Sequence, residues 1–211
     1  EKIYVTGNTV IDALIHVVDD NYLFEDSLLD SLDYNNKKII LLTAHRRENI
    51  GEPMVNIFKA IKRVIEENED VEVLYPIHLN PKVREIAKKT FGTIGRIHII
   101  EPLDYLSFAN LINKSHLVVT DSGGIQEEAP TLGKPVLVVR KETERPEGIA
   151  AGTAKLAGII EDDIYRMISE LINDSNKYDE MANAVNPYGD GRASERIRDI
   201  LINDHINNNS F

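Results

Sequence analysis

The segment 120–129, with the sequence TDSGGIQEEA, carries the strongest chemical signal in the chain. An apolar run leads into Ser122, Gly123 and Gly124, and the residues that follow are typical of a helix. Paired glycines allow close approach to the backbone, and a helix start presents unpaired N–H groups with a partial positive charge. Together these features predict an anion site suited to a diphosphate.

Glu128 lies about one helical turn beyond the glycines, where its carboxylate could accept hydrogen bonds from ribose hydroxyls. The segment is neither a Walker loop nor a GxGxxG fingerprint. On this local pattern alone, phosphate binding and a plain Gly-Gly turn that only reverses the chain both remain open.

A second loop, residues 43–49 with the sequence TAHRREN, follows another apolar run. Arg46 and Arg47 form a local positive focus in an acidic protein, and His45 has the side chain most easily used for proton transfer near neutrality. The alternative is a solvated surface loop in which the arginines pair weakly with an acidic neighbour.

Three more candidate residues follow apolar runs. Arg145 lies in a charged loop and could bind a phosphate or a sugar hydroxyl, and His78 comes shortly after a strand-like run. Phe108 offers a flat apolar surface beside a nucleobase. Read alone, each also fits a structural role: a charged exit loop, a structural histidine and a core aromatic residue.

The elements that must position these loops are short β-branched runs that alternate with helical patterns. Strands that are apolar throughout are covered on both faces, which implies parallel pairing. The predicted fold class is therefore α/β, a Rossmann-like doubly wound parallel sheet, in which ligands bind beyond the carboxyl ends of the strands. The predicted strands are 38–43, 71–76, 97–100, 117–120 and 135–139. The predicted helices are 10–18, 53–68, 81–91, 104–114, 162–173, 177–185 and 194 to about 207.

Composition narrows the class of protein. The chain has 211 residues, of which 42% are hydrophobic and 28% charged, as expected for a globular core. Its formal net charge of −11 argues against nucleic acid as a partner. The absence of cysteine excludes disulfides and thiolate sites, and no apolar run approaches the roughly 18 residues of a membrane span. No ligand spacing indicates a metal or another cofactor, and we expect a cytoplasmic protein.

The ends of the chain differ from its middle. The sequence starts at Glu1 without a methionine, directly at the strand-like residues 2–5, so we expect a longer protein. We expect residues 1–20 to form a connector and first helix, residues 21–187 a Rossmann-like lobe, and residues 188–211 a terminal helix and tail that can pack away from its own sheet. Two further expectations are a capping role for Ser194 and fraying of residues 207–210.

Taken together, these motifs resemble those of the non-hydrolysing UDP-N-acetylglucosamine 2-epimerases. Members of that family are nearly twice as long, so the chain resembles their carboxyl-terminal half, one lobe of a two-lobe GT-B enzyme. The motifs that carry the resemblance are HRREN at 45–49, TDSGGIQEEAP at 120–130, TERPE at 143–147, GNT at 7–9, GKP at 133–135, AGT at 151–153 and NPYGDG at 186–191.

The resemblance implies a role for each candidate residue. It implies that His45 is catalytic and that Arg46 and His78 contact a second, activating molecule of UDP-N-acetylglucosamine between the lobes. It also implies a set of residues for UDP: Ser122, Gly123 and Gly124 at the diphosphate, Glu128 at the ribose, Phe108 near the uracil, and Arg145 at the phosphate and sugar side.

The reaction implied is the interconversion of UDP-N-acetylglucosamine and UDP-N-acetylmannosamine. UDP is eliminated across carbon 1 and carbon 2 to give a 2-acetamidoglucal, and is then added back. The implied partners are these nucleotide sugars and UDP, with a homodimer for the complete protein. The catalytic carboxylates of the family match no position here, so we expect this chain alone to be inactive. A GT-B glycosyltransferase, a hydrolysing epimerase and a non-catalytic UDP-sugar-binding module remain alternatives.

Overall fold

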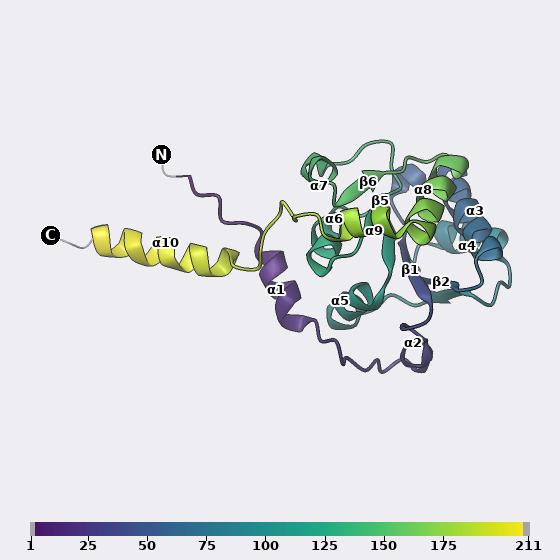
Figure 1. The fold of residues 1–211 in the computed structure, drawn as a ribbon, viewed down its shortest axis with the longest axis horizontal. Coiled ribbons are helices and arrows are strands. Elements are labelled where there is room, and N and C mark those ends of the chain that lie inside the picture. The colour runs from purple at the N-terminus through teal and green to yellow at the C-terminus, as the bar shows by residue number, and fades with distance from the viewer. Residues whose placement is uncertain (1–2, 209–211) are drawn as a thin grey trace.

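A six-stranded parallel sheet forms the centre of the molecule in the computed structural model, which describes residues 3–208 (Figure 1). The strand order is β3-β2-β1-β4-β5-β6, and every neighbouring pair is parallel. The order reverses between β1 and β4, which is the topological switch point of a doubly wound sheet. The strands are β1 (Lys38–Thr43), β2 (Val71–Pro76), β3 (Ile97–Ile100), β4 (Leu117–Thr120), β5 (Val136–Val138) and β6 (Ala154–Leu156).

Helices cover both faces of this sheet, because successive side chains of a buried strand point to opposite faces and both need apolar cover. In β1, Ile40 and Leu42 pack into one apolar cluster, whereas Ile39 and Leu41 pack into the other. The first cluster is closed by α3 (Glu52–Glu67), α4 (Pro81–Phe91) and α8 (Glu161–Asn173). The second is closed by α2 (Ser27–Ser31), α5 (Tyr105–Lys114) and α6 (Gly123–Glu128). The predicted fold class is confirmed.

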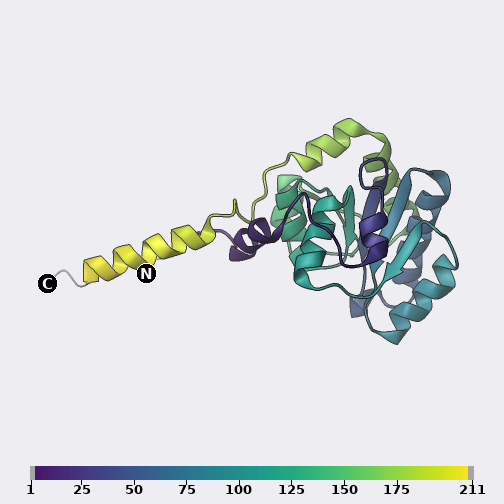
Figure 2. The same ribbon diagram turned by 90° about the horizontal axis from the view of Figure 1, so that it is seen from below.

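The remaining helices lie towards the ends of the chain or in its loops. They are α1 (Thr9–Val17), α7 (Pro146–Ala151), α9 (Ser175–Ala182) and α10 (Ala193–Asn208), with short 3-10 turns at Arg47–Asn49 and Ala129–Leu132. Both views show α10 projecting away from the sheet and its covering helices (Figures 1 and 2). No helix among residues 3–208 is both long enough and apolar enough to cross a bilayer.

The start of α10 is held by α1, which is distant in sequence. Asp12 accepts hydrogen bonds from the backbone N–H groups of Ala193 (3.1 Å) and Ser194 (2.7 Å). These bonds hold the pKa of the Asp12 carboxyl below its usual range. The prediction that Ser194 caps this helix is wrong, because the helix begins one residue earlier and takes its cap from Asp12.

Several short elements differ from prediction. Residues 3–5 do not form a strand, and the exposed side chains of Ile3 and Val5 show that no neighbouring strand covers them. The three-residue edge strand β6 and the short helices α2 and α7 were not predicted, because each is too short to develop a hydrophobic period. Of the tail expected to fray, residues 207 and 208 belong to α10, and the rest lies outside the described residues.

Candidate functional site

The candidate site lies at the carboxyl edge of the sheet, beside the switch point. The ends of β1 and β4 are tied together by a hydrogen bond of 2.6 Å between the hydroxyls of Thr43 and Thr120. The backbone N–H of Asp121 also donates to the Thr43 carbonyl at 3.0 Å. The two loops that carry the predicted residues therefore begin at strand ends whose relative positions are fixed.

Asp121 organises the loop after β1. Its carboxylate is fully buried, and Oδ2 accepts hydrogen bonds from the backbone N–H groups of His45 (2.9 Å) and Arg46 (2.8 Å) and from the Asn49 amide (3.0 Å). Oδ1 has no hydrogen-bond partner among the described residues and lies 3.7 Å from Nδ1 of His45. Sequence analysis gave Asp121 no role; the available signal was a carboxylate placed directly after a buried strand.

The structure brings His45 and His78 together. Their rings stack with centroids 5.3 Å apart and an angle of 10° between their planes. Nδ1 of His78 accepts a hydrogen bond from the backbone N–H of Asn80 at 3.0 Å, which leaves the proton of the neutral ring on Nε2. The side chain of His45 is 40% exposed, so a ligand in the crevice could reach it.

The start of α6 is partly covered. Gly124 is exposed, but Gly123 is buried, and a Cβ atom built there would lie 3.4 Å from Oε2 of Glu144 and 3.8 Å from the Arg145 guanidinium. The Ser122 side chain makes no capping bond to the helix, and its backbone N–H donates to the Thr120 hydroxyl at 2.9 Å. An anion would therefore approach α6 from the Gly124 side.

Arg145 is fixed by contacts that were not predicted. Its guanidinium donates to the buried carboxylate of Glu127, and the amide of Asn8 donates to the same carboxylate. The hydroxyl of Tyr188 donates to the Arg145 carbonyl at 3.3 Å and accepts from the backbone N–H of Gly148 at 2.9 Å. Asn8 belongs to the GNT motif and Tyr188 to the NPYGDG motif, so both motifs serve to hold this arginine.

Glu128 has a different environment from Glu127. It is half-buried, and its carboxylate makes no hydrogen bond with the described residues. Burial raises the pKa of its carboxyl, and the negative charge of Glu127 raises it further. Oε1 of Glu128 lies 3.7 Å from the position of a Cβ atom built on Gly124. Its carboxylate is thus next to the exposed part of α6 and available to a ligand.

Phe108 and Arg46 are held by different contacts. Phe108, on α5, is half-buried and packs against the apolar cluster that contains Ile125 of α6, so the structure shows it in contact with the core. Arg46 contacts Glu144 with an N–O distance of 3.3 Å. Glu144 also pairs with Arg140 at 3.0 Å, and that pairing is the main reason its pKa is lowered.

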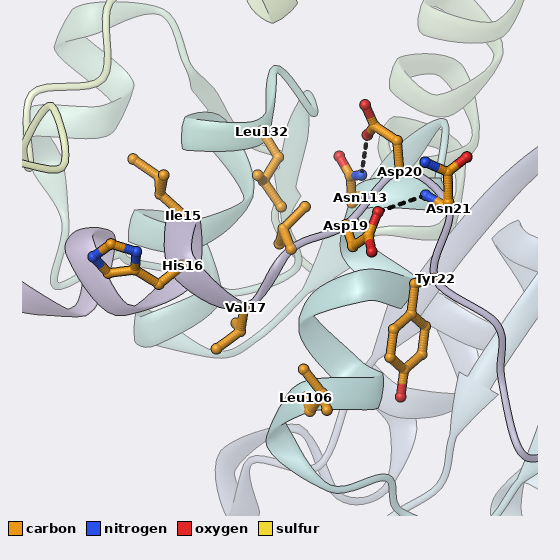
Figure 3. Close-up of a pocket in the computed structure, with 11 residues that line it drawn as sticks. Ile15, His16, Val17, Asp19, Asp20, Asn21, Tyr22, Leu106, Asn113 and Leu132 are labelled. Atoms are coloured by element: carbon orange, nitrogen blue, oxygen red, sulfur yellow. Dashed lines mark hydrogen bonds between the residues drawn. The ribbon is translucent and has the colours of Figure 1, made fainter.

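A cavity of about 920 Å³ lies elsewhere, between the end of α1 and α5, and none of the predicted site residues lines it (Figure 3). Within it, Asn113 donates to Asp20 and the backbone of Asn21 donates to Asp19. A groove of about 810 Å³ borders Arg145 and Glu144 on the side of residues 4–9. No group of three or more histidine, aspartate or glutamate side chains among the described residues could hold a metal ion.

Known proteins are similar to this chain in both sequence and fold. The family model of UDP-N-acetylglucosamine 2-epimerase matches residues 1–202. The chain belongs to this family. The UDP-N-acetylglucosamine 2-epimerase of Bacillus subtilis is 57% identical over 202 residues, which cover 96% of this chain and 52% of that protein. For the Escherichia coli K12 enzyme the identity is 45% over 211 residues, covering 97% and 56%. The chain thus spans about half the length of these relatives.

Solved structures of related proteins superpose on this chain over almost its whole length. The UDP-GlcNAc 2-epimerase of Neisseria meningitidis, bound to UDP-GlcNAc, has a TM-score of 0.85 at 43% identity and covers 96% of this chain and 56% of its own. The S. aureus protein MnaA, solved with UDP, has a TM-score of 0.87 at 55% identity, covering 93% and 53%. The epimerase-family chain therefore has the fold of one half of these proteins.

Proposed function

We propose that this chain supplies the UDP-binding half of an enzyme that interconverts UDP-N-acetylglucosamine and UDP-N-acetylmannosamine. Family membership supports the reaction, and relatives solved with UDP and with UDP-GlcNAc support the ligand. The observation that carries the proposal is the meeting of His45, Arg145 and the exposed side of α6 at one edge of the sheet, beside the switch point.

In this proposal the diphosphate lies against Ser122, Gly123 and Gly124, with Arg145 as its cationic partner. The contacts of Arg145 with Glu127 support such a role, because an arginine already held in place loses less side-chain entropy when it binds an anion. The carboxylate of Glu128, which has no hydrogen-bond partner among the described residues, accepts hydrogen bonds from the ribose hydroxyls. Phe108 borders the uracil.

Elimination of UDP builds negative charge on the diphosphate, and fixed donors at that point lower the barrier. Arg145 and the α6 backbone are the groups of this chain that can supply them. The same groups hold UDP in place for re-addition. His45 serves the proton transfers, and Asp121 positions it by fixing the loop backbone from Oδ2, with Oδ1 beside the imidazole.

The proposed activator, a second molecule of UDP-N-acetylglucosamine, contacts Arg46 and His78. His78 stacks directly on His45, which gives this second site a physical contact with the catalytic one. The ion pair of Arg46 with Glu144 joins the loop after β1 to the loop after β5, within which Glu144 also pairs with Arg140, so a ligand at Arg46 acts on both loops.

The rest of the enzyme is proposed to face the carboxyl edge of the sheet. We assign residues 1–20 to the connector, residues 21–187 to the UDP-binding lobe and residues 188–211 to a segment that crosses to the other lobe. The projection of α10 away from the sheet supports the last assignment. The complete protein is proposed to be a homodimer, and the 211-residue chain alone to give no turnover.

Calorimetric titration of the chain with UDP tests the binding half of the proposal. Because a hydrogen bond to a charged group is worth about 1.5–3 kcal/mol, Glu128→Ala is expected to weaken binding roughly tenfold or more. Glu66→Ala, which removes an exposed carboxylate on α3, is the matched control and is expected to leave the affinity unchanged. Absence of UDP binding, or equal affinity in both variants, would contradict the proposed site.

Turnover of UDP-N-acetylglucosamine by the complete protein tests the reaction. Formation of UDP-N-acetylmannosamine with exchange of solvent hydrogen at carbon 2 supports elimination and re-addition. Release of free UDP with a free sugar would indicate a hydrolysing epimerase, and sugar transfer to an acceptor would indicate a glycosyltransferase. Binding of UDP without any of these reactions would indicate a binding module.

A further inference from the structure

A cavity of about 560 Å³ opens at the amino edge of the sheet, opposite the candidate site. Lys38 at the start of β1, His116 just before β4 and Lys134 just before β5 line it, together with Tyr178 of α9. The six residues of β1 place about 20 Å between this edge and the loop that carries His45. The cavity therefore shares no residue with the proposed UDP site.

The charge of this cavity is opposite to that of the whole chain. Four lysines line it, against two aspartates, in a protein whose formal net charge is −11. One aspartate, Asp70, is paired with Lys38 at 3.1 Å. The lining thus carries two positive charges in excess. The four lysines are Lys37, Lys38, Lys114 and Lys134, and the second aspartate is Asp20.

Apart from Lys38, these lysines form no ion pair with the residues that the structure describes. The Lys37 ammonium donates to the Glu69 carbonyl at 2.9 Å, and that of Lys114 donates to the Asp20 carbonyl at 3.2 Å, so each keeps donors to spare. The half-buried Lys134 ammonium makes no hydrogen bond or ion pair with any side chain or backbone group that the structure describes. The charge of Asp20 acts on this ammonium from a distance. A partly buried ammonium without a hydrogen-bonded or paired anion is unfavourable.

His116 adds a second unsatisfied group. Its ring stacks on Tyr178 with centroids 4.2 Å apart, and its Nε2 is buried without a hydrogen-bond partner among the described residues. Burial, with a smaller effect from the charges of Lys38 and Lys134, lowers the pKa of His116 to about 4. An ammonium and an imidazole nitrogen, neither with a hydrogen-bond partner among the described residues, thus border one cavity.

We propose that this cavity binds a small phosphate monoester. A phosphate monoester carries close to two negative charges near neutrality, which match the two positive charges in excess among the residues that line the cavity. Lysine ammonium groups bind phosphate as point charges, whereas the fork that selects planar carboxylates belongs to arginine, which is absent from this lining. The amides of Asn35, Asn36 and Asn113 can hydrogen-bond the polar remainder, and the volume lies in the ~300–1,000 Å³ range of small-molecule sites.

Calorimetric titration of the 211-residue chain with glucose 6-phosphate tests this site, with glucose as the neutral control. One molecule of glucose 6-phosphate is expected to bind per chain, and glucose is not. Lys134→Gln is expected to weaken binding about tenfold, since it removes a charge-assisted contact. Lys59→Gln removes the same charge from an exposed position on α3 and is expected to leave the affinity unchanged.

Two further measurements locate the bound ester. Glucose 6-phosphate is expected to shift the ring resonances of His116 in NMR spectra and to leave those of His98, on β3, unchanged. Arg145→Gln is expected to leave the affinity intact, because that residue belongs to the other edge of the sheet. Lys114→Gln serves as a second variant at the cavity if Lys134→Gln fails to fold, which circular dichroism reports.

The proposal is overturned by any of four results: no binding of glucose 6-phosphate, equal binding of glucose, equal weakening by Lys59→Gln, or loss of binding in Arg145→Gln. The last result would assign the ester to the proposed UDP site. Conversely, failure of UDP to bind the chain would leave this proposal standing, because the two sites share no residue.

Discussion

At the residue scale, the buried carboxylate of Asp121 determines how the loop after β1 presents His45. Three donors use Oδ2, and Oδ1 is left facing the imidazole at 3.7 Å. Because an ionised carboxylate can only accept hydrogen bonds, Oδ1 of Asp121 favours the tautomer of His45 that carries its proton on Nδ1. Nε2 is then the basic nitrogen offered to a ligand.

Asp121→Asn tests this orientation. The amide oxygen can keep the two backbone N–H bonds, while the new NH2 group can donate to Nδ1 of His45. The expected result is a change from the Nδ1–H to the Nε2–H tautomer, measured by nitrogen-15 NMR, with a stability loss of about 1–3 kcal/mol. The ring of His98 should not change. An unaltered His45 tautomer would remove Asp121 as a positioning residue.

Gly124→Ala separates ligand binding from folding. A Cβ atom there would meet only Oε1 of Glu128 at 3.7 Å, which is an ordinary contact. Replacing a helical glycine should therefore raise the free energy of unfolding by about 0.5–1 kcal/mol. The same methyl group would obstruct a diphosphate, so UDP affinity should fall. Gly95→Ala, in an open loop, is the control. Unchanged UDP affinity in Gly124→Ala would contradict a diphosphate at the helix start.

His116 makes stability depend on pH. Its pKa is lowered to about 4 in the folded chain, against about 6.5 in an unfolded one, so the unfolded state binds more protons between these values. The free energy of unfolding should therefore decrease as pH falls from about 6.5 to about 4. Urea titrations across that window should show a smaller decrease for His116→Gln than for the parent chain. Equal decreases would show that this histidine is not buried in its neutral form.

At the element scale, four strands were predicted with the bounds that the structure shows: β1, β2, β3 and β4. Each of these runs has the apolar, β-branched character that a covered strand requires. The site was predicted less completely. The loops that form the site could be predicted from the ends of the strands. The contacts of Asp121 with His45 and of Asn8 with Glu127, however, join residues that are 76 and 119 positions apart. No local pattern encodes contacts over such separations.

The joint between α1 and α10 gives a test at this scale. Asp12→Ala removes both acceptors from the start of α10, and hydrogen exchange of the Ala193 and Ser194 amides should become about fivefold faster. Asn keeps one acceptor oxygen at the helix start, so Asp12→Asn should restore protection at only one of the two amides. Exchange in β1 serves as the internal control. Equal exchange in Asp12→Ala and the parent chain would rule out this cap.

At the scale of the whole molecule, α10 stands apart from the body. Leu201 and Ile202 are 65% and 50% exposed, whereas Leu41 and Leu74 in the sheet are completely buried. An apolar side chain in solvent adds little to the stability of the fold that carries it. The side chains of Leu201 and Ile202 thus add little to the core of the part of the chain that the structure describes.

Leu201→Lys follows from that exposure. In the 211-residue chain the change should alter the free energy of unfolding by less than about 0.5 kcal/mol. In the complete protein, where the proposed second lobe covers α10, the same change should be clearly destabilising. Thermal unfolding of both forms provides the comparison. A loss of stability in the short chain would mean that α10 already packs on this body.

The bonds from Asp12 to the start of α10 also have a mechanical consequence. They join α1 to the start of α10. Residues 3–8 and the projecting helix therefore leave the sheet domain at the same place. A force on α10 therefore acts on α1 and on residues 3–8 as well.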